Sequence, residues 1–298
     1  VGDDCTIRIW DLRSRKLLRM RKLPDRSRCV AFSPDGATLA VGFGGDVGRG
    51  RKKRKGRADG GYEVLSAADL STIHKAQDSR EWISQIKFSP NGQVLAIGSH
   101  DNRILLYSTS DFGLLGTCKK HNSYITHFDF SSDSSTLVSN CGAYELLFCT
   151  FRSASVCGGQ GVMLTCGVCM WYVPPSVRVS SGDQITDSKS LRDTEWASNT
   201  CILGWPVQGI FEPEADGTDV NGVDRSHNGQ WVATADDKGM VKVYNYPVLE
   251  NASSKFVLGK GHSSHVTNCR FNADDSYLLT TGGNDRSVFQ WKITPRRS

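Results

Sequence analysis

The sequence has few of the features that mark an enzyme, a fibrous chain or a disordered one. It contains no phosphate-binding loop, no Gly-x-Ser-x-Gly, no HExxH and no kinase signature. It has only 9 prolines and 4 methionines in 298 residues, and its 30 glycines follow no Gly-X-Y period, which excludes collagen. Hydrophobic residues make up 38% and charged residues 22%, so neither full disorder nor a coiled coil fits. We expect a globular chain that is not an enzyme and has no cofactor and no small-molecule substrate.

The one long stretch without charge, residues 153–177, does not predict a membrane span. Glycines dilute it and a Pro-Pro pair closes it, whereas a span needs about 20 mostly apolar residues. Cys166 and Cys169 form a CxxC, but no second pair follows at the spacing of a zinc site, so we expect no metal. The ten cysteines are irregularly spaced and no signal peptide precedes them, which favours free thiols in a reducing compartment.

Positive charge is concentrated in one short segment. The chain carries +5, yet without this segment its 29 basic residues are outnumbered by 31 acidic ones. The seven cations of this basic loop are Arg49, Arg51, Lys52, Lys53, Arg54, Lys55 and Arg57. Three interpretations stay open: a solvated loop, a patch that binds an acidic protein surface, or a nuclear-localisation or nucleic-acid patch. No aromatic residue interleaves the charges, so we do not expect nucleic acid as the partner.

A repeated phrase organises the chain. An apolar pair, a Phe and a polar turn recur, first as Ser33-Pro34-Asp35-Gly36 and then as Ser89-Pro90-Asn91-Gly92. Each turn precedes a strand that alternates apolar and polar residues, a second tight turn and a third strand that ends in an aromatic residue. The equivalent turn residues are Ser33, Ser89, Ser131, Ser226 and Asn272. Units of about 40–45 residues with four strands each are typical of WD repeats.

We therefore predict an all-β fold, a WD40-type β-propeller of about five blades plus a half blade, over residues 1–298. Because the chain starts at Val1, inside a motif, we expect it to be a fragment. The predicted units are a half blade 1–12, a blade 13–71 with a basic insertion 48–61, and blades 72–110, 111–199, 200–246 and 247–293. The fourth unit carries an anomalous stretch at about 149–180, which we interpret as either a lineage-specific loop or translated intron sequence.

The last repeat is the most complete. His262, Thr281, Asp285 and Trp291 stand where WD repeats place a hydrogen-bonded Ser/Thr–His–Asp–Trp network. We interpret this His and Asp as structural rather than catalytic. Tyr107 replaces the Trp in another repeat, and His121 keeps the His position without its preceding Gly.

Three segments carry a more specific resemblance. One runs from Glu81-Trp82-Ile83 to His100-Asp101-Asn102, a second begins Thr200-Cys201-Ile202-Leu203-Gly204-Trp205-Pro206, and a third begins Gly261-His262-Ser263-Ser264-His265. They resemble the echinoderm microtubule-associated protein-like family. The resemblance implies two fused, atypical propellers in the full protein, of which this chain looks like the C-terminal one. It also implies tubulin or microtubules as the partner and a cytoplasmic, cytoskeletal location, with other proteins docking on the propeller faces.

A second function stays open from another class. Trp10-Asp11-Leu12-Arg13 fits a WDxR box, which in some WD proteins contacts an adaptor of a ubiquitin ligase. Under this alternative the chain would be a substrate receptor. The pattern is short, and Trp-Asp is expected at this point of a WD repeat in any case.

Overall fold

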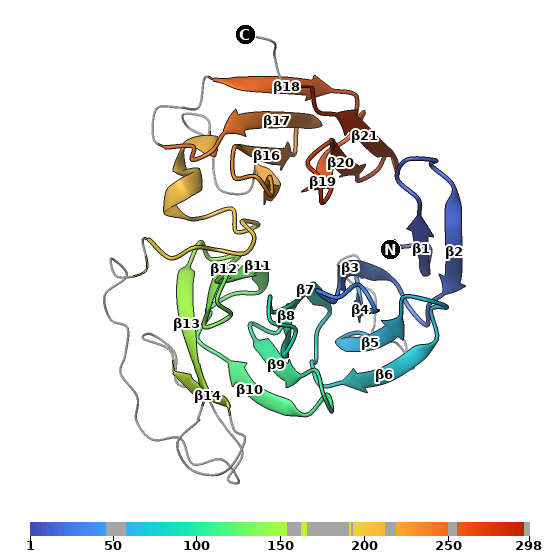
Figure 1. Cartoon of the computed structure of the whole chain (residues 1–298), viewed down its shortest axis with the longest axis vertical. Helices are drawn as coiled ribbons and strands as arrows, with labels where there is room; N and C mark the ends of the chain where they lie inside the picture. Colours follow the sequence, from blue (N-terminus) through green and yellow to red (C-terminus); the bar gives the residue numbers. More distant parts are fainter. Residues whose placement is uncertain are drawn as a thin grey trace, which may run out of the picture. The chain divides into compact units, whose positions relative to one another are not determined.

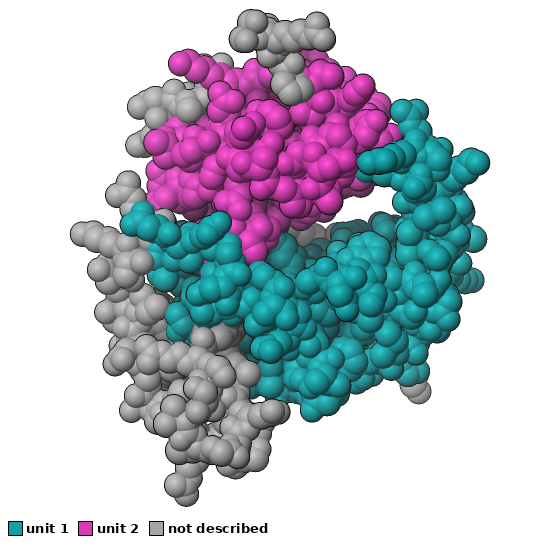
Figure 2. Space-filling view, in the orientation of Figure 1, with its two compact units in different colours: residues 1–195 teal, residues 196–298 magenta. Residues whose placement is uncertain are grey.

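The computed structural model describes residues 1–45, 58–153, 162–165, 191, 193–211, 219–249 and 255–294. The chain divides into two compact units, Val1–Glu195 and Trp196–Ser298, coloured separately in Figure 2. Both are built from antiparallel sheets, and the helical element Trp205–Ile210 is a single 3₁₀ helix, η2. The predicted all-β fold is confirmed. Within the described residues, no helix is long and apolar enough to cross a membrane.

The first unit contains four sheets that follow one another along the chain (Figure 1). A two-stranded sheet, β1–β2, is followed by the four-stranded sheets β3–β6, β7–β10 and β11–β14, each paired in chain order. The strands are β1 Thr6–Trp10, β2 Leu17–Lys22, β3 Ser27–Phe32, β4 Thr38–Phe43, β5 Gly61–Ser66, β6 Thr72–Gln77, β7 Ile83–Phe88, β8 Val94–Ser99, β9 Ile104–Ser108, β10 Leu114–Cys118, β11 Ile125–Phe130, β12 Thr136–Cys141, β13 Leu146–Ser153 and β14 Val162–Thr165.

The second unit holds η2 and two further sheets, a four-stranded one of β15–β18 and a three-stranded one of β19–β21. Its strands are β15 Val220–Arg225, β16 Trp231–Asp236, β17 Met240–Asn245, β18 Phe256–Lys260, β19 Val266–Phe271, β20 Tyr277–Gly282 and β21 Val288–Lys292. Side chains of η2, among them Val207 and Ile210, pack with Val223 and Val232 of the four-stranded sheet.

The repeated turn has one geometry in all five repeats. The hydroxyl of Ser33 accepts a hydrogen bond of 2.9 Å from the backbone N–H five residues later, and Ser89, Ser131 and Ser226 do the same. Asn272 accepts the equivalent bond with its side-chain oxygen, at 2.8 Å. The third residue after each of these takes a φ between 55° and 71°, whether it is Gly, Ser or Asp. The five turn residues named in the sequence thus share one hydrogen-bonded turn.

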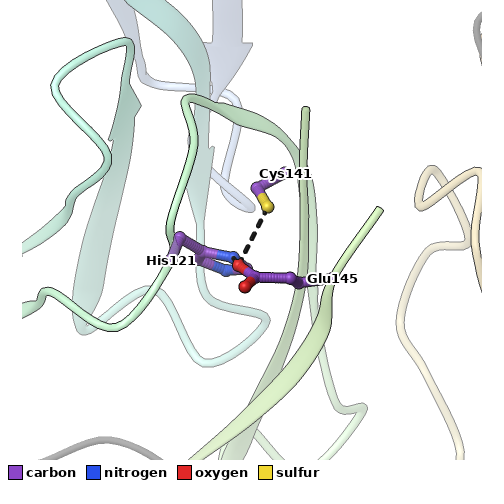
Figure 3. A group of neighbouring side chains, drawn as sticks. All are labelled: His121, Cys141 and Glu145. Atoms are coloured by element: carbon purple, nitrogen blue, oxygen red, sulfur yellow. Dashed lines mark hydrogen bonds and ion pairs between the residues drawn. The ribbon is translucent and has the colours of Figure 1, made fainter. Parts of the chain in front are cut away.

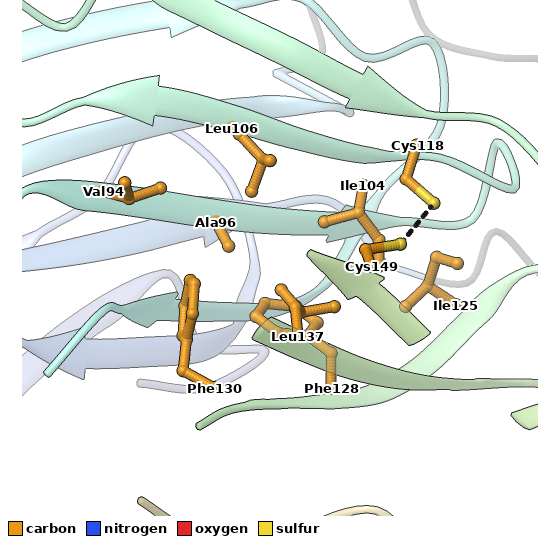
Figure 4. Close-up of a cluster of buried hydrophobic side chains, with 10 residues drawn as sticks. All are labelled: Val94, Ala96, Ile104, Leu106, Cys118, Ile125, Phe128, Phe130, Leu137 and Cys149. Carbon is orange, nitrogen blue, oxygen red and sulfur yellow. Dashed lines mark hydrogen bonds between the residues drawn. The ribbon is translucent and has the colours of Figure 1, made fainter. Parts of the chain in front are cut away.

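The cores lie between consecutive sheets of each unit. In the first unit, one cluster joins β7–β10 to β11–β14 through ten buried side chains, including Ile104, Phe128 and Phe130 (Figure 4). Another joins β3–β5 to β7–β9 around Tyr62 and Ile97. Burying one such aliphatic or aromatic side chain stabilises the fold by about 1.5–3 kcal/mol. The inner strands β4, β8 and β12 are buried along almost their whole length, whereas β2, β6 and β18 are largely exposed.

The sheets are offset from the predicted repeat limits by one strand. Strand β2 lies in the predicted unit 13–71 but pairs with β1, and β6 begins the predicted unit 72–110 but pairs with β5. The sequence motif ends on the third strand, whereas the antiparallel pairing continues to a fourth. Within the stretch 149–180, Cys149 is a buried part of β13, and residues 154–161 and 166–180 lie outside the described residues.

Candidate functional site

All seven cations of the basic loop, in the range 49–57, lie outside the described residues. The described residues on either side of them contact one segment of the next sheet. Gly44 has a φ of 117°, and a Cβ there would lie 2.2 Å from the Cβ of Trp82. A Cβ on Gly60 would lie 2.2 Å from the carbonyl oxygen of Ser79. The connection between β4 and β5 therefore begins and ends against residues 79–82.

A row of stacked aromatic rings in the first unit begins at Trp82. The guanidinium of Arg28, on β3, lies 5.3 Å from the centre of the Trp82 ring. Trp82 also stacks on His100 with 3.6 Å between ring centres, and His100 stacks on Tyr124 with 4.4 Å. Trp82 precedes β7, His100 follows β8 and Tyr124 precedes β11. The row thus joins the same end of three neighbouring sheets.

Glycines make room for these rings. A Cβ on Gly142 would lie 2.5 Å from the Tyr124 ring, and one on Gly283 would lie 2.0 Å from the ring of His265. These glycines directly follow the second strands of their sheets, as Gly44 does. Each ring can lie against the strand end only because that position has no side chain. Tyr124 stays 42% exposed, so the row presents an aromatic surface to solvent.

The hydrogen-bonded network of the last repeat forms through Thr280 rather than Thr281, which corrects the predicted residue. Trp291 Nε1–H donates to the Thr280 hydroxyl at 2.9 Å, and that hydroxyl lies 2.8 Å from His262 Nε2. Asp285 accepts from His262 Nδ1 at 2.9 Å. Thr281 instead points to the opposite face, where it bonds Thr267. The reason is the two-residue period of a strand, since Thr280 is fully buried.

Asp285 is ionised across the normal pH range. Burial alone would raise its pKa, but hydrogen bonds from the side chains of His262 and Ser287 and from the backbone of Ser263 lower it to about 2. A carboxylate with this many internal donors is held in one position. The geometry supports the structural interpretation of this His and Asp.

A variant of the same network lies in the sheet β11–β14, at a place the sequence analysis marked only by His121. His121 Nε2 lies 2.7 Å from the hydroxyl of Ser139, and Nδ1 lies 3.3 Å from Glu145 Oε2. The thiol of Cys141 donates to the same carboxylate oxygen at 3.1 Å. Figure 3 shows the three side chains of His121, Cys141 and Glu145 converging. Counting from His121 by the spacing of the last repeat would have located Ser139, but nothing in the spacing pointed to Cys141.

Two other patterns from the sequence lie elsewhere. Trp10, in the WDxR box, is 55% exposed at the end of β1, and the carboxylate of Asp11 accepts from Ser14 N–H at 2.6 Å in a local turn. Cys166 and Cys169 of the CxxC lie outside the described residues.

Comparison with known proteins identifies the family. Residues 1–161 and 159–293 match the family model of the echinoderm microtubule-associated protein second beta-propeller. The chain is 38% identical over 298 residues to human echinoderm microtubule-associated protein-like 2. It is 36% identical over 296 residues to human echinoderm microtubule-associated protein-like 3. It is also 36% identical to the 77 kDa echinoderm microtubule-associated protein of Strongylocentrotus purpuratus.

These alignments cover 98% of this chain but only 39%, 28% and 37% of the three relatives. The chain therefore spans between about a quarter and two fifths of the length of the proteins it matches. The predicted WD-type propeller is confirmed by the family model, and so is the resemblance carried by the three sequence segments. The chain belongs to the echinoderm microtubule-associated protein-like family and matches its second β-propeller.

Proposed function

We propose that this chain binds tubulin or microtubules and acts without enzymatic chemistry, as a protein-docking surface that adjusts microtubule organisation or dynamics in the cytoplasm. The observation that carries the proposal is the alignment of nearly the whole chain with proteins named for microtubule association. A propeller fold alone does not specify a function, so the proposal rests on this relationship rather than on the sheets.

The basic loop is the part of the chain we propose for electrostatic attachment to tubulin. Seven positive charges within nine residues give a dense cationic segment on an otherwise slightly acidic chain. An acidic protein surface is the partner that such a segment attracts, and the attraction weakens as salt screens it. The connection that carries these charges begins and ends against Trp82 and its neighbours. We therefore propose that the basic loop and the aromatic row engage the same partner.

Cosedimentation of the full chain with microtubules tests the proposal. We expect binding at low salt that weakens as salt is raised. Neutralising all seven cations of the basic loop to Gln should weaken binding and flatten its salt dependence. A folded chain that stays in the supernatant at every salt concentration would show that the proposed function is wrong for this part of the family.

A matched pair of variants separates the basic loop from charge in general. One variant carries Lys52→Gln, Lys53→Gln and Lys55→Gln. The other carries Lys16→Gln, Arg19→Gln and Lys22→Gln, at three exposed positions in or next to the sheet β1–β2. Both remove three charges. A larger loss of affinity in the first variant supports a specific role for the basic loop. Equal losses would show that only the net charge of the chain affects binding.

The aromatic row is tested in the same assay. Tyr124→Ala removes the most exposed ring without touching the core, because Tyr124 is 42% exposed. We expect weaker cosedimentation at both salt concentrations, since lost stacking and apolar contact are little affected by salt. Tyr144→Ala is the control, because Tyr144 is 51% exposed in the turn between β12 and β13 and no ring stacks on it among the described residues. Equal binding by both variants would remove the aromatic row from the interface.

A further inference from the structure

The group of His121, Cys141 and Glu145 differs from its counterpart in the last repeat in a way that changes its chemistry. Both groups follow the same register. His121 stands four residues before β11 as His262 does before β19, and Ser139 takes the place of Thr280. Cys141, however, takes the place of Gly282. The sulfur is thus an addition to the usual set of side chains.

The acidic residue stands one position farther from this sulfur than its counterpart does from Gly282. In the last repeat, Asp285 follows Gly282 by three residues, and a Cβ on Gly282 would lie 1.8 Å from the Asp285 carboxylate. Glu145 follows Cys141 by four residues, so its carboxylate reaches His121 from farther along the turn. The result is a nitrogen, a sulfur and an oxygen that all lie within 4.8 Å of one another.

The tryptophan of the last repeat has a different side chain in its place beside His121. In the last repeat, Trp291 donates to Thr280, whose single hydroxyl proton is then available to His262 Nε2. Cys149 takes the position of Trp291, because it pairs with Leu137 as Trp291 pairs with Leu278. A thiol thus stands where the last repeat has an indole N–H.

The Ser139 hydroxyl lies 2.7 Å from His121 Nε2 and 3.5 Å from the carbonyl oxygen of Leu147. As in the last repeat, Nδ1–H of the His ring donates to a carboxylate, here Glu145 Oε2 at 3.3 Å. A metal ion can take the place of this proton, because the neutral ring can carry its one proton on Nε2 instead, where the Ser139 hydroxyl accepts it.

We propose that His121 Nδ1, Cys141 Sγ and Glu145 Oε2 bind one zinc ion, with water in the fourth position. For tetrahedral zinc, bond lengths of 2.0–2.3 Å place nitrogen, oxygen and sulfur ligands about 3.4–3.6 Å apart. The observed separations are 3.3 Å from nitrogen to oxygen and 3.1 Å from sulfur to oxygen. Binding releases the thiol proton to solvent, and the hydrogen bond from Nε2 to Ser139 orients the ring as an outer partner does in zinc proteins.

A zinc ion can reach this group from solvent, and once bound it connects two segments of the sheet. The side chain of Glu145 is 24% exposed, while that of His121 is buried, so zinc enters from the carboxylate side. Once bound, it reinforces the link between the loop before β11 and the turn between β12 and β13, where the backbone N–H of Asn122 donates to Glu145 Oε2 at 3.0 Å. In the last repeat the equivalent link includes the Asp–His–Thr–Trp chain. The metal thus adds a connection to a sheet in which Cys149 stands at the place of that tryptophan.

Zinc retention by the full chain tests this proposal. The protein, carrying Cys166→Ser and Cys169→Ser to remove the CxxC, is reduced, loaded with Zn²⁺, desalted and titrated with a chromophoric chelator. We expect one equivalent of retained zinc, and a thiolate-to-metal absorption band when Co²⁺ replaces it. Cys141→Ala should lose both, and Glu145→Gln should bind more weakly. Cys118→Ala, at a buried thiol of the neighbouring sheet, should keep both.

Folding of each variant is checked by circular dichroism, and the two ligand variants serve as independent tests in case one fails to fold. No zinc retained by the parent protein would overturn the proposal. So would an unchanged cobalt spectrum in a folded Cys141→Ala variant. The proposal would also be overturned if ¹⁵N NMR of the metal-treated protein showed the His121 ring protonated on both nitrogens. The group would then be an ion pair between His121 and Glu145 that binds no zinc.

Discussion

Exchanging two adjacent threonines for valine tests the network of the last repeat directly. Thr280→Val keeps the shape of the side chain but removes the hydroxyl that accepts from Trp291 and bonds His262. Both partners are then left without this bond next to a fully buried position. Since an unsatisfied buried polar group costs about 1–3 kcal/mol, we expect a loss of about 2–4 kcal/mol in the free energy of unfolding.

Thr281→Val is the matched control, one residue away on the same strand. Its hydroxyl bonds Thr267 on the solvent-accessible face, where loss of a bond is replaced by water. We expect a change within about 0.5 kcal/mol. Urea denaturation followed by tryptophan fluorescence and by circular dichroism measures both. If Thr281→Val destabilises the protein as much as Thr280→Val, the assignment of the network to Thr280 is wrong.

Three further outcomes are expected from the same denaturation assay. Because the pKa of Asp285 is lowered from 3.8 to about 2 in the folded state, its contribution is complete above about pH 4 and is lost as pH falls toward 2; the stability difference between the parent and Asp285→Asn should shrink over that interval, and a constant difference would contradict this. Phe128→Ala, at a fully buried ring between two sheets, should cost about 3–5 kcal/mol, and a cost below 1 kcal/mol would mean that this core is not formed. Asp224→Ala leaves the backbone N–H of Phe271, which the Asp224 carboxylate binds at 2.7 Å, without its partner and should cost about 1–3 kcal/mol, while hydrogen exchange at that amide should accelerate.

The repeated turn made the fold predictable from sequence. Its Ser or Asn side chain, its polar residues and its positive φ are decided within a few neighbouring residues. Local chemistry of this kind can be read from the chain alone. The strands between the turns were predictable because a short run of strand-forming residues bounded by turns is visible over five or six residues, although β8 is buried along its whole length rather than on alternate residues.

The details that failed depend on pairing between strands. Thr280 and Thr281 are both acceptable in the sequence motif, and only the face that β20 turns toward the core distinguishes them. The limits of the sheets depend on a fourth strand that carries no motif, as β6 shows. The rings of the aromatic row lie far apart in the sequence, at Trp82, His100 and Tyr124. The sequence feature that could have predicted their contact is their shared position at strand ends, opposite glycines such as Gly142.

The stacked aromatic row also affects how much side-chain conformational entropy is lost when a partner binds. Trp82 contacts Arg28 and stacks on His100, and Tyr124 stacks on His100 and lies against Gly142. These contacts leave few other rotamers open to the rings. Fixing a freely rotating side chain at an interface costs about 0.5–1.5 kcal/mol. The rings of this row are already fixed in the folded chain before a partner binds. A partner that lies flat on these rings would find them in place, so its affinity would reflect the contacts it makes with little loss to ordering.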